Sequence, residues 1–254
     1  MKTQKLIIEW LNNYSQNSNL TTFVVGVSGG VDSALVSTLC AETGIKTIVV
    51  SMPIHQHKSE LDRAHKHIKW LKDKYNNVSS MEVNLSHVYD TFEMMFADNE
   101  NKLALANSRA RLRMTTLYQI AQTNEGLVVG TGNKVEDFGV GFFTKYGDGG
   151  VDISPIADLM KSEVRASAID LGVISDIIKA KPTDGLWGDD RTDEDQLGAT
   201  YDELEWAMNY TEGMLNDFSC TDKQEKVLKI YNRLNKQNKH KMIPIPVFIK
   251  NNNI

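Results

Sequence analysis

The sequence has few cysteines, no excess of positive charge and no long apolar run. Its 254 residues include only two cysteines, Cys40 and Cys220, whose spacing is typical neither of metal ligands nor of a redox pair. Two unpaired thiols in a reducing compartment are the favoured interpretation, with a single disulfide as the alternative. The formal net charge of -5 argues against a general nucleic-acid-binding protein, which normally carries a basic face.

No apolar run in the sequence approaches the length needed to span a bilayer, so we predict no transmembrane helix. The N-terminal segment, residues 1–18, is typical of an amphipathic helix. It lacks the continuous apolar stretch and the small-residue cleavage site of a signal peptide. With 41% apolar and 24% charged residues, the composition is that of an ordinary globular protein. We therefore expect a cytoplasmic protein that binds neither nucleic acid nor a membrane.

Short apolar segments alternate with helical patterns along most of the chain. This alternation predicts an α/β fold, with a doubly wound, mostly parallel sheet covered by helices on both faces. Ligands of such sheets bind beyond the carboxyl ends of the strands. The predicted strands are Thr22–Val27, Lys46–Met52, Val78–Leu85 and Gly126–Gly130, with a short extended piece at Ile153, and the predicted helices are Asp32–Thr43, His57–Tyr75, Val88–Ala97, Leu103–Thr123, Lys161–Leu171, Glu194–Met208 and Thr221–Asn238.

The strongest local signal is the segment Gly26–Ala34, GVSGGVDSA, between the first predicted strand and its helix. It is not a Walker A loop, because no GK[ST] follows, and its glycine spacing differs from the dinucleotide-binding fingerprint. Gly29 and Gly30 let the backbone approach an anion closely, and the amides at the start of the next helix attract negative charge. Ser28 and Ser33 add hydroxyl donors. This segment therefore predicts a phosphate site.

Asp32 adds a carboxylate to a loop that otherwise suits an anion. A carboxylate repels a polyphosphate unless a hard cation lies between them, and Mg²⁺ accepts oxygens from both. A simple helix cap is the alternative for a serine–glycine–glycine triplet, but the strand–loop–helix context favours phosphate. The segment resembles the loop of the ATP pyrophosphatases, which cleave ATP at the α-phosphate. That resemblance implies the class of enzyme and not its substrate.

Two further charged segments follow in the middle of the chain. The first places three arginines, Arg109, Arg111 and Arg113, within five residues, and a helix can turn only one or two of them toward a ligand. A solvated cationic face is the alternative. The second, Gly130–Lys161, contains seven glycines among lysines and carboxylates. Because a structural loop rarely needs so many permissive positions, the part Thr131–Val151 is a candidate lid over a substrate.

The segment Gly130–Lys161 closely resembles the signature of the ammonia-dependent NAD synthetases. Two later segments, Lys181–Glu205 and Asn238–Pro244, resemble the late motifs of that family in the same order. The similarity thus covers nearly the whole chain from Gly26 onward. It implies an adenine nucleotide α-hydrolase-like fold, and one synthetase domain over residues 1–254 without a glutaminase domain. It also implies a homodimer.

By matching position, the resemblance implies roles for individual residues. The catalytic residues would be Asp32, Glu136 and Lys161, with Asp32 and Glu136 as ligands of Mg²⁺. The ATP-binding residues would be Gly26, Val27, Ser28, Gly29, Gly30, Val31, Asp32, Ser33, Thr131, Lys161 and Thr183. Contacts with deamido-NAD would come from Arg111, Lys145, Asp152, His240 and Lys241. The stretch between Glu136 and Lys145 is one residue longer than the usual family pattern.

The implied reaction converts deamido-NAD to NAD, the last step of NAD biosynthesis. The nicotinate carboxylate would attack the α-phosphorus of ATP and release pyrophosphate, and ammonia would then displace AMP from the adenylated carboxyl group. The tasks left to the protein are positioning, charge neutralisation and exclusion of water. A glutamine-dependent enzyme needs a cysteine nucleophile with a supporting base. Neither cysteine suits that role, so we expect ammonia as the nitrogen donor.

Two other functions fit parts of the sequence. Another ATP pyrophosphatase, such as a tRNA-thiolating enzyme, would favour paired catalytic cysteines and a basic surface. A regulatory module that binds nucleotides without turnover would not need the carboxylates and the lysine at positions 32, 136 and 161. Incubation with ATP, Mg²⁺, ammonium and deamido-NAD would separate the three functions.

Overall fold

The computed structural model describes residues 2–97, 101–183, 192–215 and 219–250. Its centre is a parallel four-stranded sheet in the order β3-β2-β1-β4, which confirms the predicted α/β fold. The strands are β1 Thr22–Gly26, β2 Lys46–Ser51, β3 Val78–Glu82 and β4 Gly126–Val128. The helices are α1 Thr3–Ser18, α2 Val31–Glu42, α3 Lys58–Lys74, α4 Ser86–Met94, α5 Lys102–Thr123, the π-helix η2 Val135–Val140, α6 Lys161–Asp170, α7 Ser175–Ile178, α8 Asp193–Leu197, α9 Tyr201–Thr211 and α10 Asp222–Met242.

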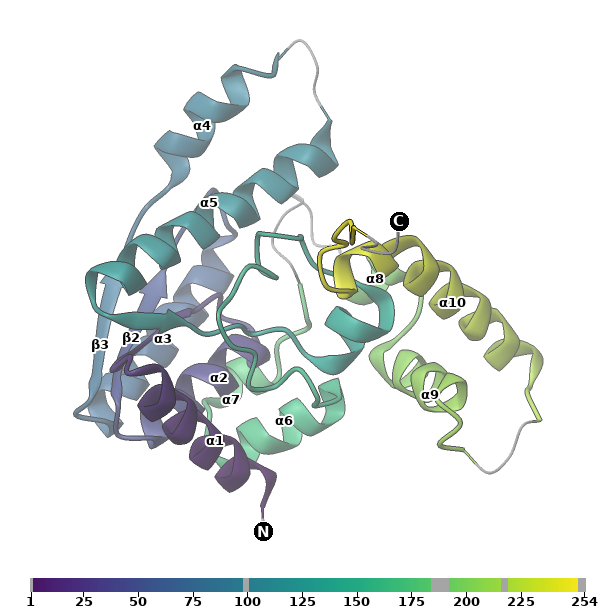
Figure 1. Cartoon of the computed structure of the whole chain (residues 1–254), viewed down its shortest axis with the longest axis horizontal. Helices are drawn as coiled ribbons and strands as arrows, with labels where there is room; N and C mark the ends of the chain where they lie inside the picture. The colour runs from purple at the N-terminus through teal and green to yellow at the C-terminus, as the bar shows by residue number, and fades with distance from the viewer. Residues whose placement is uncertain (1, 98–100, 184–191, 216–218, 251–254) are drawn as a thin grey trace.

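Helices cover both faces of the sheet, as the sequence predicts (Figure 1). The side chains of β1 alternate between the two faces. Phe23 and Val25 pack in one core with residues of α1, α2 and α6, whereas Val24 packs in another core with residues of α4 and α5. Complete burial of each such side chain contributes about 1.5–3 kcal/mol. The expected extended piece is also present, as an isolated parallel bridge between Val129 and Ile153.

A second group of elements lies beside the sheet. Helices α9 and α10 pack on each other and on η2, and Figure 1 shows this pair on the right, away from the strands. Their shared core includes Val135 and Val140 of η2, Leu204 of α9 and Tyr231 of α10. This packing brings the late part of the chain against the segment that follows β4. The sheet edge and the second group together enclose the site described below.

The glycine-rich segment after β4 is not only loop, because residues Val135–Val140 form the π-helix η2. A π-helix accommodates one more residue per hydrogen-bonded turn than an α-helix, and such turns are frequent at functional sites. The stretch from Glu136 to Lys145, which we expect to be one residue longer than the family pattern, begins in this helix. The helix ends at Gly141, whose φ of +66° suits a residue without a side chain. We did not expect a helix here, since the surrounding glycines favour loop.

The prediction of one helix over Glu194–Met208 was wrong. The chain forms α8 and α9 there, separated by Gly198 with a φ of +79°. The side chain of Thr200 then accepts a hydrogen bond from the backbone N–H of Glu203 and caps α9. A glycine in the left-handed conformation ends a helix, and a threonine cap begins the next. These local signals override the apolar spacing that runs through both helices.

Two predictions on cysteines and membranes can be compared with the structure. Both Cys40 and Cys220 are free thiols, as favoured above. Burial raises the pKa of the Cys40 thiol far above its ordinary value, so that thiol is unreactive. Within the described ranges, no helix combines the length and the apolar character needed to cross a membrane.

Candidate active site

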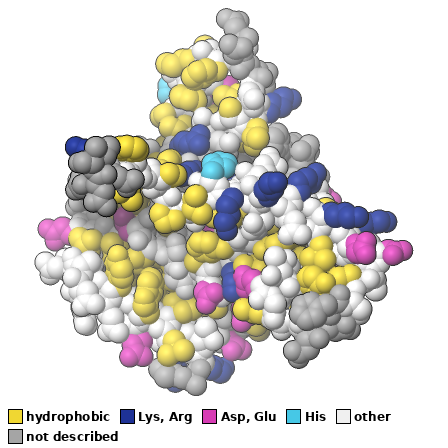
Figure 2. Space-filling view, turned by 45° about the vertical axis from the view of Figure 1, so that its right-hand side comes forward, with side chains coloured by type: hydrophobic (Ala, Val, Ile, Leu, Met, Phe, Trp, Pro, Cys, Tyr) yellow, Lys and Arg dark blue, Asp and Glu magenta, His cyan; other side chains and the backbone are white. Residues whose placement is uncertain are grey.

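A cavity of about 920 Å³ opens at the carboxyl ends of the strands. Gly26 at the end of β1, Ser51 at the end of β2 and Val129 after β4 all line it. This is the position expected for a ligand of a parallel sheet. Every site residue predicted from the sequence lines this cavity except Asp152. Figure 2 shows Lys and Arg side chains gathered across the middle of one face of the molecule.

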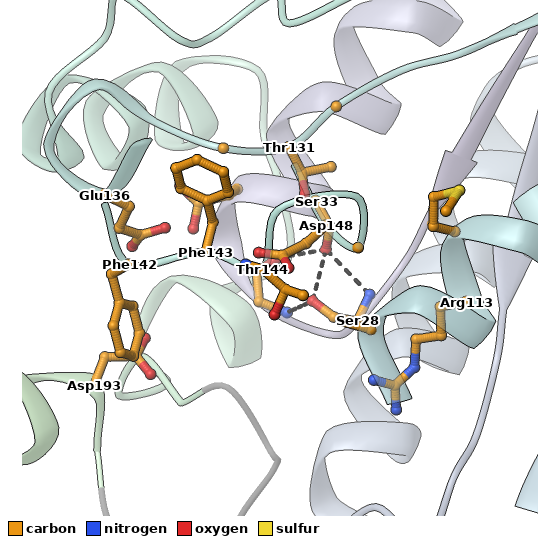
Figure 3. A pocket seen from close by; sticks show the side chains of 18 of the residues that line it. Ser28, Ser33, Arg113, Thr131, Glu136, Phe142, Phe143, Thr144, Asp148 and Asp193 are labelled. Carbon is orange, nitrogen blue, oxygen red and sulfur yellow. Dashed lines mark hydrogen bonds between the residues drawn. The ribbon is translucent and has the colours of Figure 1, made fainter. Parts of the chain in front are cut away.

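The first wall of the cavity is the loop between β1 and α2. The Ser28 hydroxyl accepts a hydrogen bond from the Gly30 N–H at 3.2 Å, and the Ser33 hydroxyl accepts one from the Ser28 N–H at 3.2 Å. Figure 3 shows these two serines joined by dashed lines in the pocket. Gly29 has a φ of +88°, and a Cβ atom there would lie 2.5 Å from the carbonyl oxygen of Glu60. The loop is therefore a tight backbone turn at the start of α2, as an anion site requires.

The three predicted catalytic residues meet in this cavity, although they are distant in the sequence. The Lys161 ammonium lies 2.6 Å from Asp32 Oδ2 and 2.8 Å from Glu136 Oε1. Its side chain is only 4% exposed. Burial alone would lower the pKa of Lys161, but the two carboxylates raise it above its ordinary value. Lys161 therefore remains charged, and its ammonium group offsets part of the negative charge of the buried Asp32 and Glu136 carboxylates.

The two carboxyl groups respond differently to this environment. Burial, assisted by the nearby Glu136 carboxylate, holds the pKa of Asp32 above its usual range. Burial would also raise the pKa of Glu136, but the Lys161 ammonium and several hydrogen bonds bring it below its usual value. Both carboxylates converge on one cation, and Mg²⁺ usually takes one or two carboxylates together with substrate phosphates. The donor set thus fits a magnesium–nucleotide complex.

Three residues that the sequence did not single out support this group. Asn133 is completely buried; it donates to Asp32 Oδ1 at 3.0 Å and accepts from the Glu136 N–H at 3.1 Å. The Tyr201 hydroxyl donates to the Glu136 carboxylate and lies 3.2 Å from Asp193 Oδ2. The Lys161 ammonium also lies 4.7 Å from the centre of the Tyr201 ring. All three residues fall inside segments that resemble the family, which is the one signal that could have identified them.

The three clustered arginines point in different directions. Arg111 and Arg113 line the cavity, whereas Arg109 lies over the Tyr89 ring at 4.6 Å. Arg113 donates from Nε to the carbonyl oxygen of Met52 at 3.1 Å, and burial lowers its pKa to about 10. Figure 3 shows Arg113 across the pocket from Glu136 and Asp193. The cavity therefore has two cations on its α5 side, within reach of an anionic substrate.

The remaining predicted nucleotide contacts come from loops and from the end of α10. Lys145 donates to the carbonyl oxygen of His240 at 3.1 Å, and Lys241 donates to the carbonyl oxygen of Phe143 at 2.7 Å. These bonds fasten the end of α10 to the segment after η2. Thr183 donates to the carboxylate of Glu60 and stands at the end of a described range. The part of the late motif over residues 184–191 lies outside the described residues.

Asp152 does not line the cavity. Its carboxylate accepts a hydrogen bond from the Val128 N–H at 2.8 Å and another from the Tyr118 hydroxyl at 3.0 Å. Within this chain it ties the end of β4 to α5. Its predicted contact with deamido-NAD stays a prediction, although the neighbouring Val151 lines the cavity.

Comparison with known proteins identifies the family. The model of the family described as NAD synthase matches residues 3–244. An NH(3)-dependent NAD(+) synthetase from Mesoplasma florum is 39% identical over 228 residues, covering 88% of this chain and 89% of that protein. One from Alkaliphilus metalliredigens is 35% identical, covering 97% of each chain. The structure of the NMN synthetase from Francisella tularensis matches with a TM-score of 0.85 and 29% identity, covering 98% of this chain and 97% of that one. The chain therefore belongs to the NAD synthase family.

Proposed function

We propose that this chain forms NAD from deamido-NAD, ammonia and ATP. One observation carries this proposal: Lys161 joins Asp32 and Glu136 directly beside the glycine loop, inside the cavity at the strand ends. That arrangement suits binding of a metal-bound triphosphate next to a second anionic substrate. The relatives named NH(3)-dependent NAD(+) synthetase, which match most of this chain, support the same reaction.

The proposed chemistry has two steps. The substrate carboxylate attacks the α-phosphorus of ATP, so that a C–O–P linkage forms and pyrophosphate leaves. Ammonia then attacks the activated carbonyl carbon, a proton is lost, and AMP leaves with the linking oxygen. The backbone amides of the loop Gly26–Ser33 bind phosphate, and Lys161 neutralises charge on it. Thr131 and Thr183 line the same cavity, where they would contact ATP.

Asp32 and Glu136 would hold Mg²⁺ in this proposal. When bound, the ion would offset the negative charge of the phosphates against these carboxylates. On the other side of the cavity, Arg111, Lys145 and Lys241 would supply positive charge for the phosphates of deamido-NAD, and His240 lines the same space. The segment Thr131–Val151 covers this space, and its closure would protect the adenylate from water.

A second candidate substrate comes from one of the matched structures. The NMN synthetase from Francisella tularensis aligns over nearly all of both chains, and a mononucleotide would need fewer contacts than deamido-NAD. The position of Asp152 outside the cavity fits this alternative for a single chain. Parallel measurement of kcat/KM for deamido-NAD and nicotinate mononucleotide decides between them, and a preference for the mononucleotide would overturn the dinucleotide proposal.

We also propose a homodimer, with the protein acting in the cytoplasm. An apolar surface on the projecting arm formed by α4 and the start of α5 supports dimerisation: Met94, Met95, Phe96 and Leu103 are between 46% and 77% exposed. Hydrophobic side chains gather on this arm at the top of Figure 2. Monomeric proteins rarely expose such a patch. Light scattering with size-exclusion chromatography tests the proposed dimer, and we expect Met95→Glu to weaken it.

Two free thiols support the proposed location in the cytoplasm, which is a reducing compartment.

Asp32→Asn is the direct test of the proposed metal role. The substitution keeps the size of the side chain but removes one carboxylate from the pair around Lys161. We expect AMP formation to fall by at least about 100-fold, the range found when one group that stabilises transition-state charge is removed. The circular dichroism spectrum should stay that of the parent. Full activity in Asp32→Asn would contradict the role of this carboxylate.

A further inference from the structure

Positive charge is concentrated on α10, the helix whose end reaches the active site. This helix contains seven Lys or Arg residues and two acidic residues, both of which lie in its first turn. The whole chain, by contrast, has a net charge of -5, so the remainder of the molecule is more acidic than the total. An anion that approaches the protein is therefore repelled by its net charge and attracted by α10.

The positive side chains of α10 form a stripe along one face of the helix. The basic stripe consists of exposed residues at intervals of three and four positions, Lys226, Lys229, Arg233, Lys236 and His240. This spacing places side chains on the same face of a helix. The buried residues of α10, Val227 and Tyr231, lie on the opposite face and pack in the core shared with η2 and α9. Figure 2 shows Lys and Arg side chains in a row across one face of the molecule.

Acidic neighbours do not neutralise the basic stripe. Lys223, which precedes it, forms an ion pair with Glu203 of α9 at 2.6 Å. Among the residues that the structure describes, none of the four Lys and Arg side chains of the stripe forms an ion pair. The helix dipole favours cations in the last turn of a helix, but Lys226 and Lys229 lie more than three turns before the end of α10. Their charge therefore remains available to an anion in solution.

The basic stripe ends at the wall of the active-site cavity. His240, its last member, lines that cavity together with the neighbouring Lys241. The carbonyl oxygen of His240 accepts a hydrogen bond from Lys145 at 3.1 Å, which holds the end of α10 against the segment after η2. An anion near Arg233, in the middle of the stripe, lies about 10 Å from its end. That length is also the distance over which charges interact at about 0.1 M salt.

We propose that the basic stripe attracts the anionic nucleotide substrates, ATP and deamido-NAD, from solution toward the active-site cavity. The chemistry that it recognises is the phosphate groups common to both. This inference rests on the function proposed above. The Lys and Arg residues of the stripe do not line the cavity, so bound substrates contact other side chains. The stripe therefore raises the association rate constants without taking part in the chemical step.

Charge reversal on α10 tests the stripe, and charge reversal on α3 is the matched control. The stripe variant combines Arg233→Glu with Lys236→Glu, two exposed positions three residues apart. The control variant combines Lys69→Glu with Lys72→Glu, which are also exposed, have the same spacing and give the same change in net charge. The end of α3 leads into the start of β3, at the edge of the sheet opposite the cavity, and neither lysine lines the cavity.

Stopped-flow measurement with a fluorescent ATP analogue gives the association rate constant directly. At low salt we expect this constant to be about tenfold smaller in the stripe variant than in the control variant. The kcat/KM for deamido-NAD should fall by a similar factor, whereas kcat should stay that of the parent, because the stripe does not contact the reacting atoms. At about 1 M salt, where the Debye length is about 3 Å, the two variants should have equal association rate constants.

Equal association rate constants of the two variants at low salt would show that the stripe does not attract nucleotides. A lower kcat in the stripe variant, with the association rate constant of the control, would also overturn the inference. If the parent binds the ATP analogue but makes no NAD, the proposed function fails, and the association rate constants still decide on the stripe. Should the stripe variant not give the circular dichroism spectrum of the parent, Lys229→Gln with Lys236→Gln removes charge from the same face and is judged by the same comparison.

Discussion

Replacing Lys161 with methionine tests the charge balance at the centre of the site. Methionine fills a similar length but has no ammonium group, so Asp32 and Glu136 lose the cation that lies 2.6 and 2.8 Å away. Their side chains are only 17% and 16% exposed, and water compensates little. Removing one partner of a buried ionic group costs about 3–5 kcal/mol. For a protein of this size, that corresponds to a fall in Tm of roughly 6–20 °C.

Thermal unfolding in EDTA measures this effect, using the parent, Lys161→Met, Asp32→Asn and the double variant. In Lys161→Met two buried carboxylates remain without a cation. In the double variant one carboxylate is removed together with the ammonium, so the net charge of the group is the same as in the parent. We expect the double variant to be more stable than the sum of the single effects predicts, by about 1–3 kcal/mol. Mg²⁺ should raise the Tm of Lys161→Met more than that of the parent, because the acidic pair that has lost its ammonium partner binds another cation.

The reasoning would be refuted by simple addition. If the two single changes add within about 0.5 kcal/mol in the double variant, the residues are energetically independent. A Lys161→Met protein as stable as the parent would also show that the ammonium does not offset the buried carboxylates.

Three further changes probe the loop, the supporting tyrosine and a buried histidine. Gly29→Ala should weaken ATP binding about tenfold or more, because a Cβ atom would lie 2.5 Å from the Glu60 carbonyl oxygen and the residue has a φ of +88°. Isothermal titration with ATP measures this loss of affinity. Gly44→Ala is the control for backbone strain alone, because Gly44 also has a positive φ, +78°, but open space around it. Tyr201→Phe keeps the ring near Lys161 but removes the hydrogen bond to Glu136. We therefore expect the free energy of unfolding to fall by about 1–2 kcal/mol and the KM for Mg²⁺ to rise. If the free energy of unfolding and the KM for Mg²⁺ both stayed unchanged, the supporting role of Tyr201 would be contradicted. Burial lowers the pKa of His67 from 6.5 to about 4. Between pH 6.5 and about 4 the unfolded chain therefore binds a proton that the folded chain does not. The free energy of unfolding falls as the pH falls through this range. Urea unfolding should show a loss of about 2 kcal/mol from this group between pH 7 and 5, which His67→Gln should remove; an equal pH dependence in both proteins would rule out this assignment.

The sequence predicted the sheet well because its strands depend on local signals. Runs such as TFVVG and KTIVVS are apolar, rich in β-branched residues and followed by turn residues, so they are recognisable without knowledge of the fold. The same holds for the loop Gly26–Ser33, whose glycines and serines follow one another in the chain. By contrast, the break between α8 and α9 depends on Gly198 and Thr200 only, and a continuing apolar pattern conceals it.

The supporting residues of the site could not be predicted because their roles arise from tertiary contacts. Asn133 is an ordinary loop asparagine in the sequence, and only the fold places it between Asp32 and the Glu136 backbone. Tyr201 opens α9, far along the chain from η2, and reaches Glu136 because α9 packs on that helix. Motif resemblance identifies such positions as part of a family segment but does not reveal their contacts.

The position of Lys161 explains how two carboxylates can face each other in a site meant for phosphates. Bringing buried like charges together is costly, and a protein that did so only on binding would lose affinity for its substrate. Here Lys161 is anchored at the start of α6 and meets Asp32 of α2 and Glu136 of η2 as the chain folds. The cost of convergence is thus offset during folding, by packing and by an internal cation. Oxygens that are already converged need little reorganisation when a cation–nucleotide complex arrives, which is the condition under which fixed charges stabilise a transition state most.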